Sequence, residues 1–305
     1  MISLESQTEV RSDPLLPLTT RFGAVRIAVT DRDRALAIWR DTVGLELIGE
    51  DPEALHLGVG TTELITLELG AARPVAEHTL GLYHVAIHVP TRADLAQMAV
   101  RALKNRVRIS PTDHLVSEAI YLWDYDNNGI EITFETPERG RIGGPEEGAY
   151  AVAHDGTSHS GREPIDLDDL LGELGPAPVL QPAMPAGTRI GHVHLHVTDL
   201  EQAMHYYRDG IGFGGLFIMR RFGMGDTGLD YMPHALAFNI WAGPSAAQPP
   251  AGSAGLRYLQ IVLPDQAALD AARTRLQSVG APVTDTNEGL TSKDPAGNEV
   301  RLTVA

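Results

Sequence analysis

The sequence predicts an α+β fold built from four tandem βαβββ units. Four stretches of the chain open alike, because an alternating strand pattern leads through an Asp, Pro or Thr turn into an amphipathic helix. Short strand-like segments, separated by glycine or polar turns, follow each predicted helix. Gly- and Pro-rich stretches at 138–188 and 242–255 separate unit two from unit three and unit three from unit four.

The four units follow one another along the chain. They open with "GAVRIAVTDRDRALAIW", "LYHVAIHVPTRADLAQM", "GHVHLHVTDLEQAMHYY" and "LRYLQIVLPDQAALDAA". In the third unit Asp199 is the predicted N-cap, and the apolar stripe of the helix comprises Leu200, Ala203, Met204 and Tyr207. Later strands are predicted in "LHLGVG" and "ITLEL", in "SEAIYLWD" and "GIEITFE", in "GGLFIMRRF" and "HALAFNIWA", and in "GLTSKD" and "EVRLTV".

These units divide the chain into four segments. They are an N-terminal leader (1–19), a first pair of units (20–137), a connector (138–188) and a second pair of units (189–305). Within the connector, "IDLDDLLGEL" predicts a short helix. The stretch "FGMGDTG" lacks the strand–helix setting of a phosphate-binding loop, and we interpret it as a flexible loop over the site.

Composition narrows the class of protein. The 305 residues include 43% hydrophobic and 21% charged residues, which is ordinary for a globular protein with a core. A formal net charge of −16 argues against nucleic acid or an anionic membrane as a partner. The N-terminus lacks a signal-peptide pattern, and no apolar run reaches the ~20 residues of a membrane span. We therefore expect a soluble, cytoplasmic protein.

The stretch "IGHVHLHV" places three histidines on one face of a predicted strand. His192, His194 and His196 alternate with apolar residues, and side chains in a strand alternate between faces. Three imidazoles are costly to bury, so we expect at least one of them to have a chemical use. Because the chain has no cysteine, any metal must bind to His, Asp or Glu.

A tandem of βαβββ units resembles the vicinal oxygen chelate superfamily, which includes glyoxalases, fosfomycin-resistance proteins and extradiol ring-cleaving dioxygenases. The resemblance covers about residues 20–305 and is strongest to catechol 2,3-dioxygenase-like proteins. It rests on "GLYHVAIHVP", "DHLVSEAIYLWDYDNNGIEI", "IGHVHLHVTDLEQA" and "HALAFNIWAG". The resemblance implies two cup-shaped mixed sheets with outer helices. It also implies metal ligands on the first strand of each unit and on the last strand of one or both.

Matching the four units assigns the ligands that the resemblance implies. The common first-strand position holds Ala24, His84, His192 and Tyr258. In unit two, "DYDNNGIE" fits the last-strand motif of the superfamily and places Glu131 at the carboxylate position. In unit four, "DPAGNEVR" places Arg301 there, with Glu299 as a weak substitute. The implied ligands are His84, Glu131 and His192, a set typical of non-haem Fe(II) oxygenases, while Mn(II) stays open.

This ligand set bears on how the units pair. If unit one paired with two and unit three with four, His192 would be separated from His84 and Glu131. If unit two pairs with unit three, one complete site forms, and the long connector allows this pairing. The metal ligands favour this second arrangement. More familiar extradiol enzymes take their ligands from units three and four, and this chain departs from that pattern.

The resemblance also implies residues that act beside the metal. His234, in "PHALAF", matches an acid–base histidine, and imidazole suits that role because its pKa lies near neutrality. Tyr121 could orient the catecholate, His114 could donate to a substrate oxygen, and His194 could contact substrate. We interpret His88 and His196 as histidines that satisfy hydrogen bonds inside the cup. The three tryptophans are interpreted as packing residues: Trp39, Trp123 and Trp241.

The predicted function is an extradiol (meta) ring-cleaving dioxygenase that takes a small aromatic diol and O2 on Fe(II). Two alternatives stay open. One is a non-redox metal-dependent isomerase, lyase or transferase of the same superfamily. The other is a small-molecule binding protein without catalysis. The sequence also leaves open whether the protein is a homo-oligomer.

Overall fold

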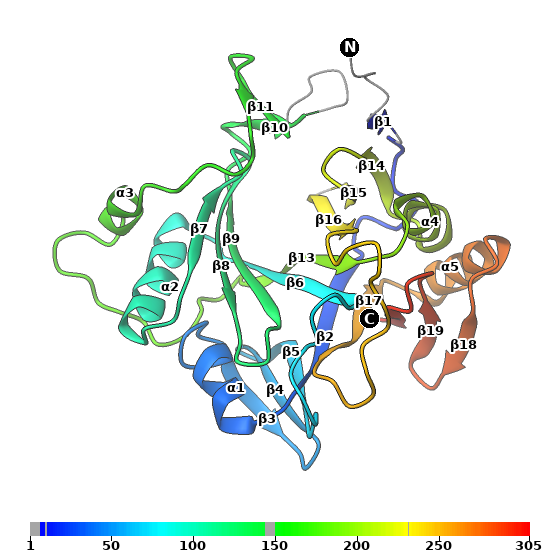
Figure 1. Ribbon diagram of the computed structural model, residues 1–305, viewed down its shortest axis with the longest axis horizontal. Helices are drawn as coiled ribbons and strands as arrows, with labels where there is room; N and C mark the ends of the chain where they lie inside the picture. Colours follow the sequence, from blue (N-terminus) through cyan, green and yellow to red (C-terminus); the bar gives the residue numbers. More distant parts are fainter. Residues whose placement is uncertain (1–6, 10, 144–149, 231) are drawn as a thin grey trace.

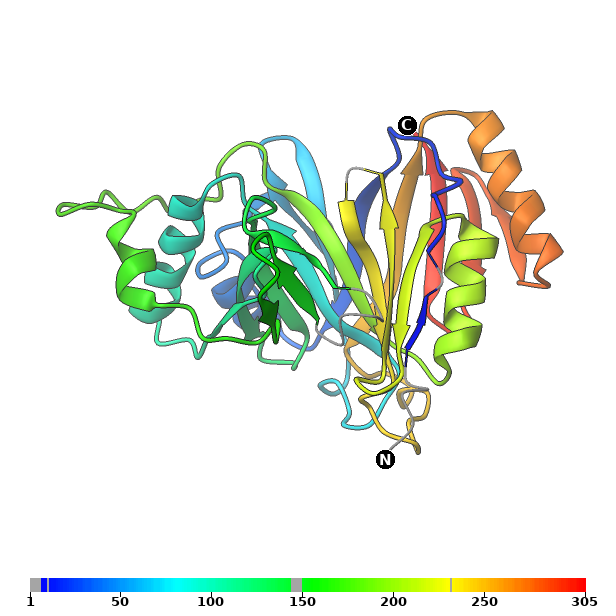
Figure 2. The same ribbon diagram turned by 90° about the horizontal axis from the view of Figure 1, so that it is seen from above.

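Two large mixed β-sheets form the centre of the fold, and helices cover their outer faces (Figures 1 and 2). The computed structural model describes residues 7–9, 11–143, 150–230 and 232–305. Parts of the predicted leader (1–6 and 10) and of the connector (144–149) lie outside the described residues. The predicted α+β class with tandem βαβββ units is confirmed.

Each unit contributes one strand, a helical segment and three further strands. Unit one comprises β2 (Arg21–Val29), α1 (Arg32–Trp39), β3 (Glu46–Glu50), β4 (Ala54–Val59) and β5 (Thr62–Leu69). Unit two comprises β6 (Gly81–His88), α2 (Arg92–Lys104), β7 (Ser110–Asp113), β8 (Ser117–Trp123) and β9 (Gly129–Glu135). Unit three comprises β13 (Arg189–His196), α4 (Leu200–Met204), the π-helical segment η1 (His205–Ile211), β14 (Gly214–Met219), β15 (Met224–Leu229) and β16 (Met232–Asn239). Unit four comprises β17 (Gly255–Leu263), α5 (Gln266–Ser278), β18 (Val283–Thr286), β19 (Gly289–Lys293) and β20 (Glu299–Val304).

The same N-cap position starts the helix of every unit. A side-chain oxygen accepts a hydrogen bond from the backbone N–H three residues later, which satisfies a donor that the helix itself leaves free. The distances are 2.8 Å at Asp199, as predicted, and 2.8 Å at Asp265. Asp31 and Thr91 form the corresponding bonds at 2.9 Å and 3.2 Å. This shared start supports the reading of the chain as a repeat.

The units pair two-with-three and one-with-four. The first sheet has the order β1-β14-β15-β16-β13-β6-β9-β8-β7, in which β1 is Gln7–Glu9. The second sheet has the order β18-β19-β20-β17-β2-β5-β4-β3. Antiparallel pairing of β6 with β13 joins units two and three, and His84 lies opposite His194. Antiparallel pairing of β17 with β2 joins units one and four.

The interpretation of "FGMGDTG" as a flexible loop is wrong. Residues Met224–Leu229 form β15, which pairs with β14 on one side and β16 on the other. Gly225 lies opposite Phe238, and a Cβ added at Gly225 would lie 2.4 Å from the Phe238 ring. Glycine inside a strand is typical of such a close approach. The glycine content reflects packing in the sheet and not a loop.

The connector has more structure than its composition predicts. The predicted helix is present as α3 (Leu167–Gly172), whose N-cap Asp166 accepts from the Asp168 N–H at 3.0 Å. A small three-stranded sheet was not predicted, and it consists of β10 (Gly140–Ile142), β11 (Ala151–Ala153) and β12 (Ser158–His159).

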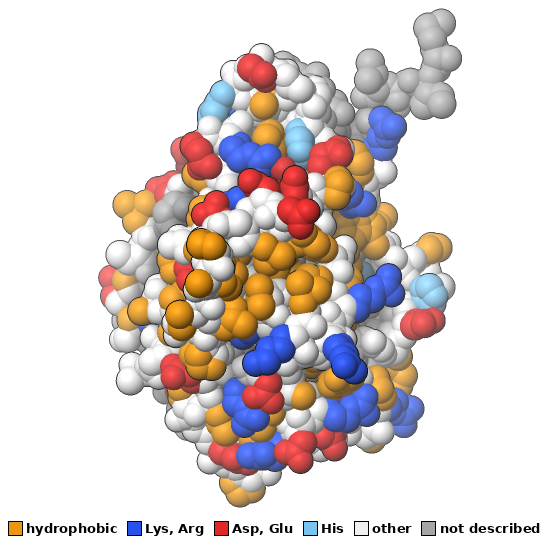
Figure 3. Space-filling model, turned by 90° about the vertical axis from the view of Figure 1, so that its left-hand side faces the viewer, with side chains coloured by type: hydrophobic (Ala, Val, Ile, Leu, Met, Phe, Trp, Pro, Cys, Tyr) orange, Lys and Arg blue, Asp and Glu red, His pale blue; other side chains and the backbone are white. Residues whose placement is uncertain are grey.

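The outer surface near α2 and α3 carries exposed apolar side chains. Figure 3 shows them gathered on this side of the molecule, and they include Leu103, Val179 and Leu180. In the described chain, no helix has the length and apolar character needed to cross a bilayer.

Candidate metal centre and cavity

Three side chains from units two and three converge inside the first sheet. The His84 Nε2 atom lies 2.9 Å from Glu131 Oε2, and His192 Nε2 lies 3.0 Å from the same oxygen. The two Nε2 atoms are 3.1 Å apart. All three side chains are buried. Among the described residues, this is the only group of three His, Asp or Glu side chains close enough to share a metal ion.

Strand pairing brings the three residues together. Ala86 of β6 lies opposite His192 of β13 and opposite Glu131 of β9, so the three residues form a row across adjacent strands. His84 lies two residues before Ala86 and therefore points to the same face. Because Ala86 has only a methyl group, the longer side chains of the row can meet above it. The pairing of unit two with unit three is thus what completes the cluster.

The donor set fits a first-row transition metal. Two imidazoles and one carboxylate are the ligands of non-haem Fe(II) oxygenase sites, and Mg²⁺ or Ca²⁺ would instead favour oxygen ligands. Ligand atoms bound about 2.1 Å from one ion at right angles lie about 3 Å apart, close to the spacing of these three atoms. With both Nε2 atoms unprotonated, the two imidazole nitrogens and the carboxylate oxygen would each offer a lone pair to a shared cation. His84, Glu131 and His192 could therefore hold such an ion.

The charge states of the cluster suit metal binding. Burial, together with the nearby charge of His234, lowers the pKa of His192 well below its usual range. Burial opposes ionisation of Glu131, but the two adjacent histidines outweigh it and hold the pKa of Glu131 well below its usual range. Metal ligation needs neutral imidazole and ionised carboxylate, and the pKa shifts of His192 and Glu131 are in the corresponding directions.

Neighbouring polar groups orient two of the three side chains. Thr133 donates its hydroxyl to Glu131 Oε1 at 2.9 Å, which fixes the second carboxylate oxygen. His88 Nε2 lies 3.3 Å from His192 Nδ1, and its other nitrogen lies 3.4 Å from Glu135 Oε1. Such outer contacts commonly fix the ring orientation of a metal-binding histidine. His88, interpreted from sequence as a hydrogen-bonding residue of the cup, is thus in direct contact with the cluster.

His234 lies against the cluster and is held by a buried carboxylate. Its ring centroid is 4.2 Å from that of His192, and its Nδ1 contacts Asp226 Oδ2. Asp226 is fully buried on β15. Burial alone would lower the pKa of His234, but the charge of Asp226 and its hydrogen bond outweigh burial and raise it. Sequence reasoning missed Asp226 because it lies in the stretch that was interpreted as a loop.

His114 and Tyr121 form a hydrogen-bonded pair at the wall of the cavity. His114 Nδ1 bonds the carbonyl oxygen of Gly161 in the connector, so this nitrogen carries the proton. His114 Nε2 then accepts from the Tyr121 hydroxyl at 2.9 Å. Burial lowers the pKa of His114 and raises the pKa of Tyr121 well above its usual value. The imidazole is therefore neutral and the phenol protonated at pH 7.

His194 lies beside the cluster within a group of aromatic rings. Its ring centroid is 5.0 Å from that of His84 and 5.3 Å from that of Trp241. The Asn239 amide donates to His194 Nε2 at 2.9 Å and accepts from His196 Nδ1 at 2.7 Å. The amide therefore satisfies both histidines, and His196 has the hydrogen-bonding role expected from sequence.

A cavity of about 610 Å³ opens over the cluster. The three cluster residues line it, and so do His114, Tyr121, His194 and His234. Its apolar wall includes Phe222, Met224 and two tryptophans, Trp123 and Trp241. The packing interpretation did not predict that these two tryptophans line the cavity. The connector supplies a further wall through Tyr150, Gly161 and Arg162, which the linker composition gave no reason to expect.

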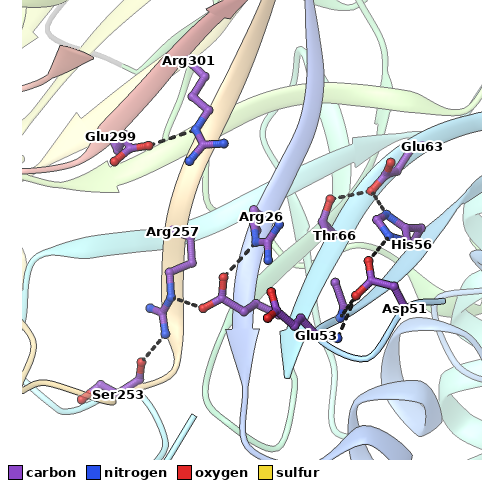
Figure 4. A network of polar contacts seen from close by, with 12 residues as sticks. Arg26, Asp51, Glu53, His56, Glu63, Thr66, Ser253, Arg257, Glu299 and Arg301 are labelled. Atoms are coloured by element: carbon purple, nitrogen blue, oxygen red, sulfur yellow. Dashed lines mark hydrogen bonds and ion pairs between the residues drawn. The ribbon is translucent and has the colours of Figure 1, made fainter. Parts of the chain in front are cut away.

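The second sheet carries different side chains at the equivalent positions. Arg301 stacks over the Tyr258 ring at 3.6 Å and also pairs with Glu299 at 3.0 Å. Glu68 pairs with both Arg26 and Arg257, as Figure 4 shows for the two arginines. Tyr258 and Arg301 thus stand where the first sheet has His192 and Glu131.

Comparison with known proteins places this geometry in a family. Residues 21–134 match the family model described as the glyoxalase/bleomycin resistance protein/dioxygenase superfamily. A curated relative named catechol-2,3-dioxygenase, from Bacillus subtilis (strain 168), is 32% identical over 282 residues, which cover 90% of this chain and 94% of the relative.

Solved structures share the fold at lower identity. Glyoxalase I from Zea mays has a TM-score of 0.58 at 15% identity, covering 94% of this chain and 92% of its own. The cppA protein from Streptococcus pneumoniae TIGR4 has a TM-score of 0.53 at 15% identity, covering 93% of this chain and 98% of its own. Given the family match and the long, 32% identical relative, the chain belongs to the glyoxalase/bleomycin resistance protein/dioxygenase superfamily.

Proposed function

We propose that the protein is an extradiol dioxygenase that cleaves a catechol ring with Fe(II) held by His84, Glu131 and His192. The observation that carries this proposal is the meeting of three ligand atoms, 2.9–3.1 Å apart, at the wall of a cavity with aromatic lining. The relative named catechol-2,3-dioxygenase supports the same reaction class. Bound Fe(II) would supply open positions for both catechol oxygens and for O2, together with the redox chemistry.

The Tyr121–His114 pair suits the binding of a catechol oxygen. The Tyr121 hydroxyl donates a hydrogen bond to His114 Nε2, so its oxygen can accept a hydrogen bond from a substrate hydroxyl. The carbonyl oxygen of Gly161 fixes the His114 ring and its tautomer. The pair would thereby orient the substrate without changing its own charge.

His234 suits the delivery of a proton. Asp226 binds Nδ1 and favours the protonated ring, which leaves Nε2 as the second donor of an imidazolium. Its ring lies 4.2 Å from that of His192, beside the proposed reaction centre. A general acid in this position can protonate an oxygen of the reacting substrate. His194 completes the wall on which the substrate ring would lie.

The number of candidate metal ligands distinguishes a dioxygenase from the two alternative functions. Non-redox sites of the superfamily use two carboxylates with two His or Gln, whereas the cluster here has three members among the described residues. A site with one carboxylate and open positions favours the dioxygenase. The cavity and the intact cluster together argue against a small-molecule binding protein that has lost its metal-binding residues.

Anaerobic reconstitution with Fe(II), followed by O2 uptake on a panel of catechols, tests the proposal. We expect O2 consumption with a yellow ring-opened product, and we expect His84→Ala, Glu131→Ala and His192→Ala to lose bound iron and O2 uptake together. The exposed His205→Gln serves as the control and should keep both. Retained iron and rate in any one triad variant would remove that residue from the site. An iron-loaded protein that consumes no O2 with any catechol would overturn the dioxygenase reading.

A further inference from the structure

One arginine of the connector lines the cavity without a partner of opposite charge. Arg162 is exposed at the cavity, and its guanidinium lies 5.4 Å from the centroid of the Trp241 ring. Within the described ranges, no carboxylate forms an ion pair with this guanidinium. Another connector arginine, Arg139, is paired with Asp113. The contact with Trp241 places the charge of Arg162 at the cavity.

A short series of rings links Arg162 to the metal cluster. Trp241 lies 5.3 Å from His194, centroid to centroid, and His194 lies 5.0 Å from the ligand His84. The charge of Arg162 also affects two tyrosines of the cavity wall. Burial raises the pKa of Tyr83 and of Tyr150, and the positive charge of Arg162 opposes both shifts. Arg162 and the cluster therefore line the same cavity, joined by the rings of Trp241 and His194.

Positively charged side chains line the cavity of this acidic chain. The chain has a formal net charge of −16, yet Arg11 and Arg162 both line the cavity. Two carboxylates also line it. Glu131 belongs to the cluster, and Glu135 pairs with Arg189 at 3.2 Å. Positive groups at a cleft concentrate anions locally, even on an acidic protein.

We infer that the substrate is a catechol with an acidic ring substituent, and that Arg162 determines this specificity by binding the substituent. This inference rests on the proposed function. A planar guanidinium matches a carboxylate in two parallel hydrogen bonds, and such charge-assisted bonds are stronger than neutral ones. The apolar face of Trp241 holds the guanidinium in place and supports the adjacent ring of the substrate.

The test compares a catechol that carries a carboxymethyl group with the methyl ester of the same compound. For each compound, kcat/KM is measured on the Fe(II) enzyme and Kd is measured anaerobically by calorimetry. We expect the wild-type protein to prefer the acid about tenfold. Arg162→Gln should remove this preference, because it should lower kcat/KM and raise Kd for the acid alone. Arg162→Lys should keep part of the preference. Arg108→Gln, an exposed arginine outside the cavity lining, should behave as wild type.

The possible results separate this inference from the proposed function. If Arg162→Gln lowered kcat/KM equally for the acid and the ester, the inference would be overturned, because the arginine would then act on the catechol group that both compounds share. An unchanged preference in Arg162→Gln would overturn it as well. If wild-type protein turned over the ester and not the acid, the inference would fail while the dioxygenase stood. The wild-type protein could also consume O2 with neither compound and still bind the acid more tightly than the ester. The inference would then hold, and the proposed dioxygenase reaction would be wrong.

Discussion

At the scale of single residues, Asp226 contacts His234 and affects its protonation. The carboxylate is fully buried and contacts Nδ1, so it orients the ring and stabilises its protonated form. An amide at this position could keep the shape but would supply no negative charge. His234 would then be protonated less often at neutral pH, and its ring could adopt the other tautomer.

We therefore expect Asp226→Asn to bind Fe(II) normally and to lose about 100-fold in kcat, within the ~10²–10⁴-fold range of general acid–base catalysis. Metal analysis and steady-state O2 uptake check this prediction. The exposed Asp230→Asn, from the same unit, is the matched control and should keep the wild-type rate. A wild-type kcat in Asp226→Asn would show that the proton of His234 is not needed.

Some residues of the candidate site could be predicted from the sequence, and others could not. His84 and His192 could be found because they occupy the same first-strand position of their units, and Glu131 because it fits the last-strand motif. Asp226 could not, because its meeting with His234 depends on how two strands of a hairpin pack. Arg162 has no counterpart in any repeat, and only the folded connector brings it to the cavity.

At the scale of elements, ion pairs on the second sheet give a pH-dependent contribution to stability. His56 of β4 lies 2.8 Å from Glu63 of β5 and 3.2 Å from Asp51 in the preceding turn (Figure 4). The hydrogen bond with Glu63 raises the pKa of His56, although partial burial opposes the shift. A histidine whose pKa is raised on folding stabilises the fold when it is protonated.

The sign of this effect follows from the raised pKa. The contribution of His56 is fully present below the pKa of the unfolded chain, about 6.5, and is lost as pH rises through the higher folded value. We expect the difference in unfolding free energy between wild type and His56→Gln to fall from at most about 1 kcal/mol near pH 5.5 to near zero at about pH 8.5. Urea unfolding at both pH values measures it. The exposed His154→Gln should show no such trend, and a pH-independent difference for His56→Gln would contradict the prediction.

Most elements could be predicted because local signals agree with the fold. Each of the four unit helices has its own N-cap. The turns "DYDNN" and "DPAGN" each begin with a buried aspartate that makes the same kind of hydrogen bond. Asp124 accepts from Asn128 N–H at 2.9 Å, and Asp294 accepts from Asn298 N–H at 2.8 Å. The strand β15 could not be predicted, since its glycines disfavour a strand until β14 and β16 pair with it.

At the scale of the whole molecule, the cluster joins the two halves of the chain. Unit two precedes the connector and unit three follows it, and the two meet where β6 pairs with β13. The pairing could be inferred because only this arrangement brings His84, Glu131 and His192 together. The packing of the connector over the cavity could not be inferred, because it depends on contacts such as that of His114 with Gly161.

A metal that binds both halves must stabilise the folded chain, because the unfolded chain has no assembled site. At a free metal concentration 100 times Kd, the expected gain is about 2.7 kcal/mol. We expect Mn(II), or Fe(II) without oxygen, to raise the Tm of wild-type protein, and we expect Glu131→Gln to abolish the rise. Glu299→Gln is the matched control, since Glu299 lies on the last strand of unit four and pairs with Arg301. Scanning calorimetry measures the shift. If Glu299→Gln abolished the rise and Glu131→Gln kept it, the metal would bind the second sheet, and the assignment of the site to units two and three would be wrong.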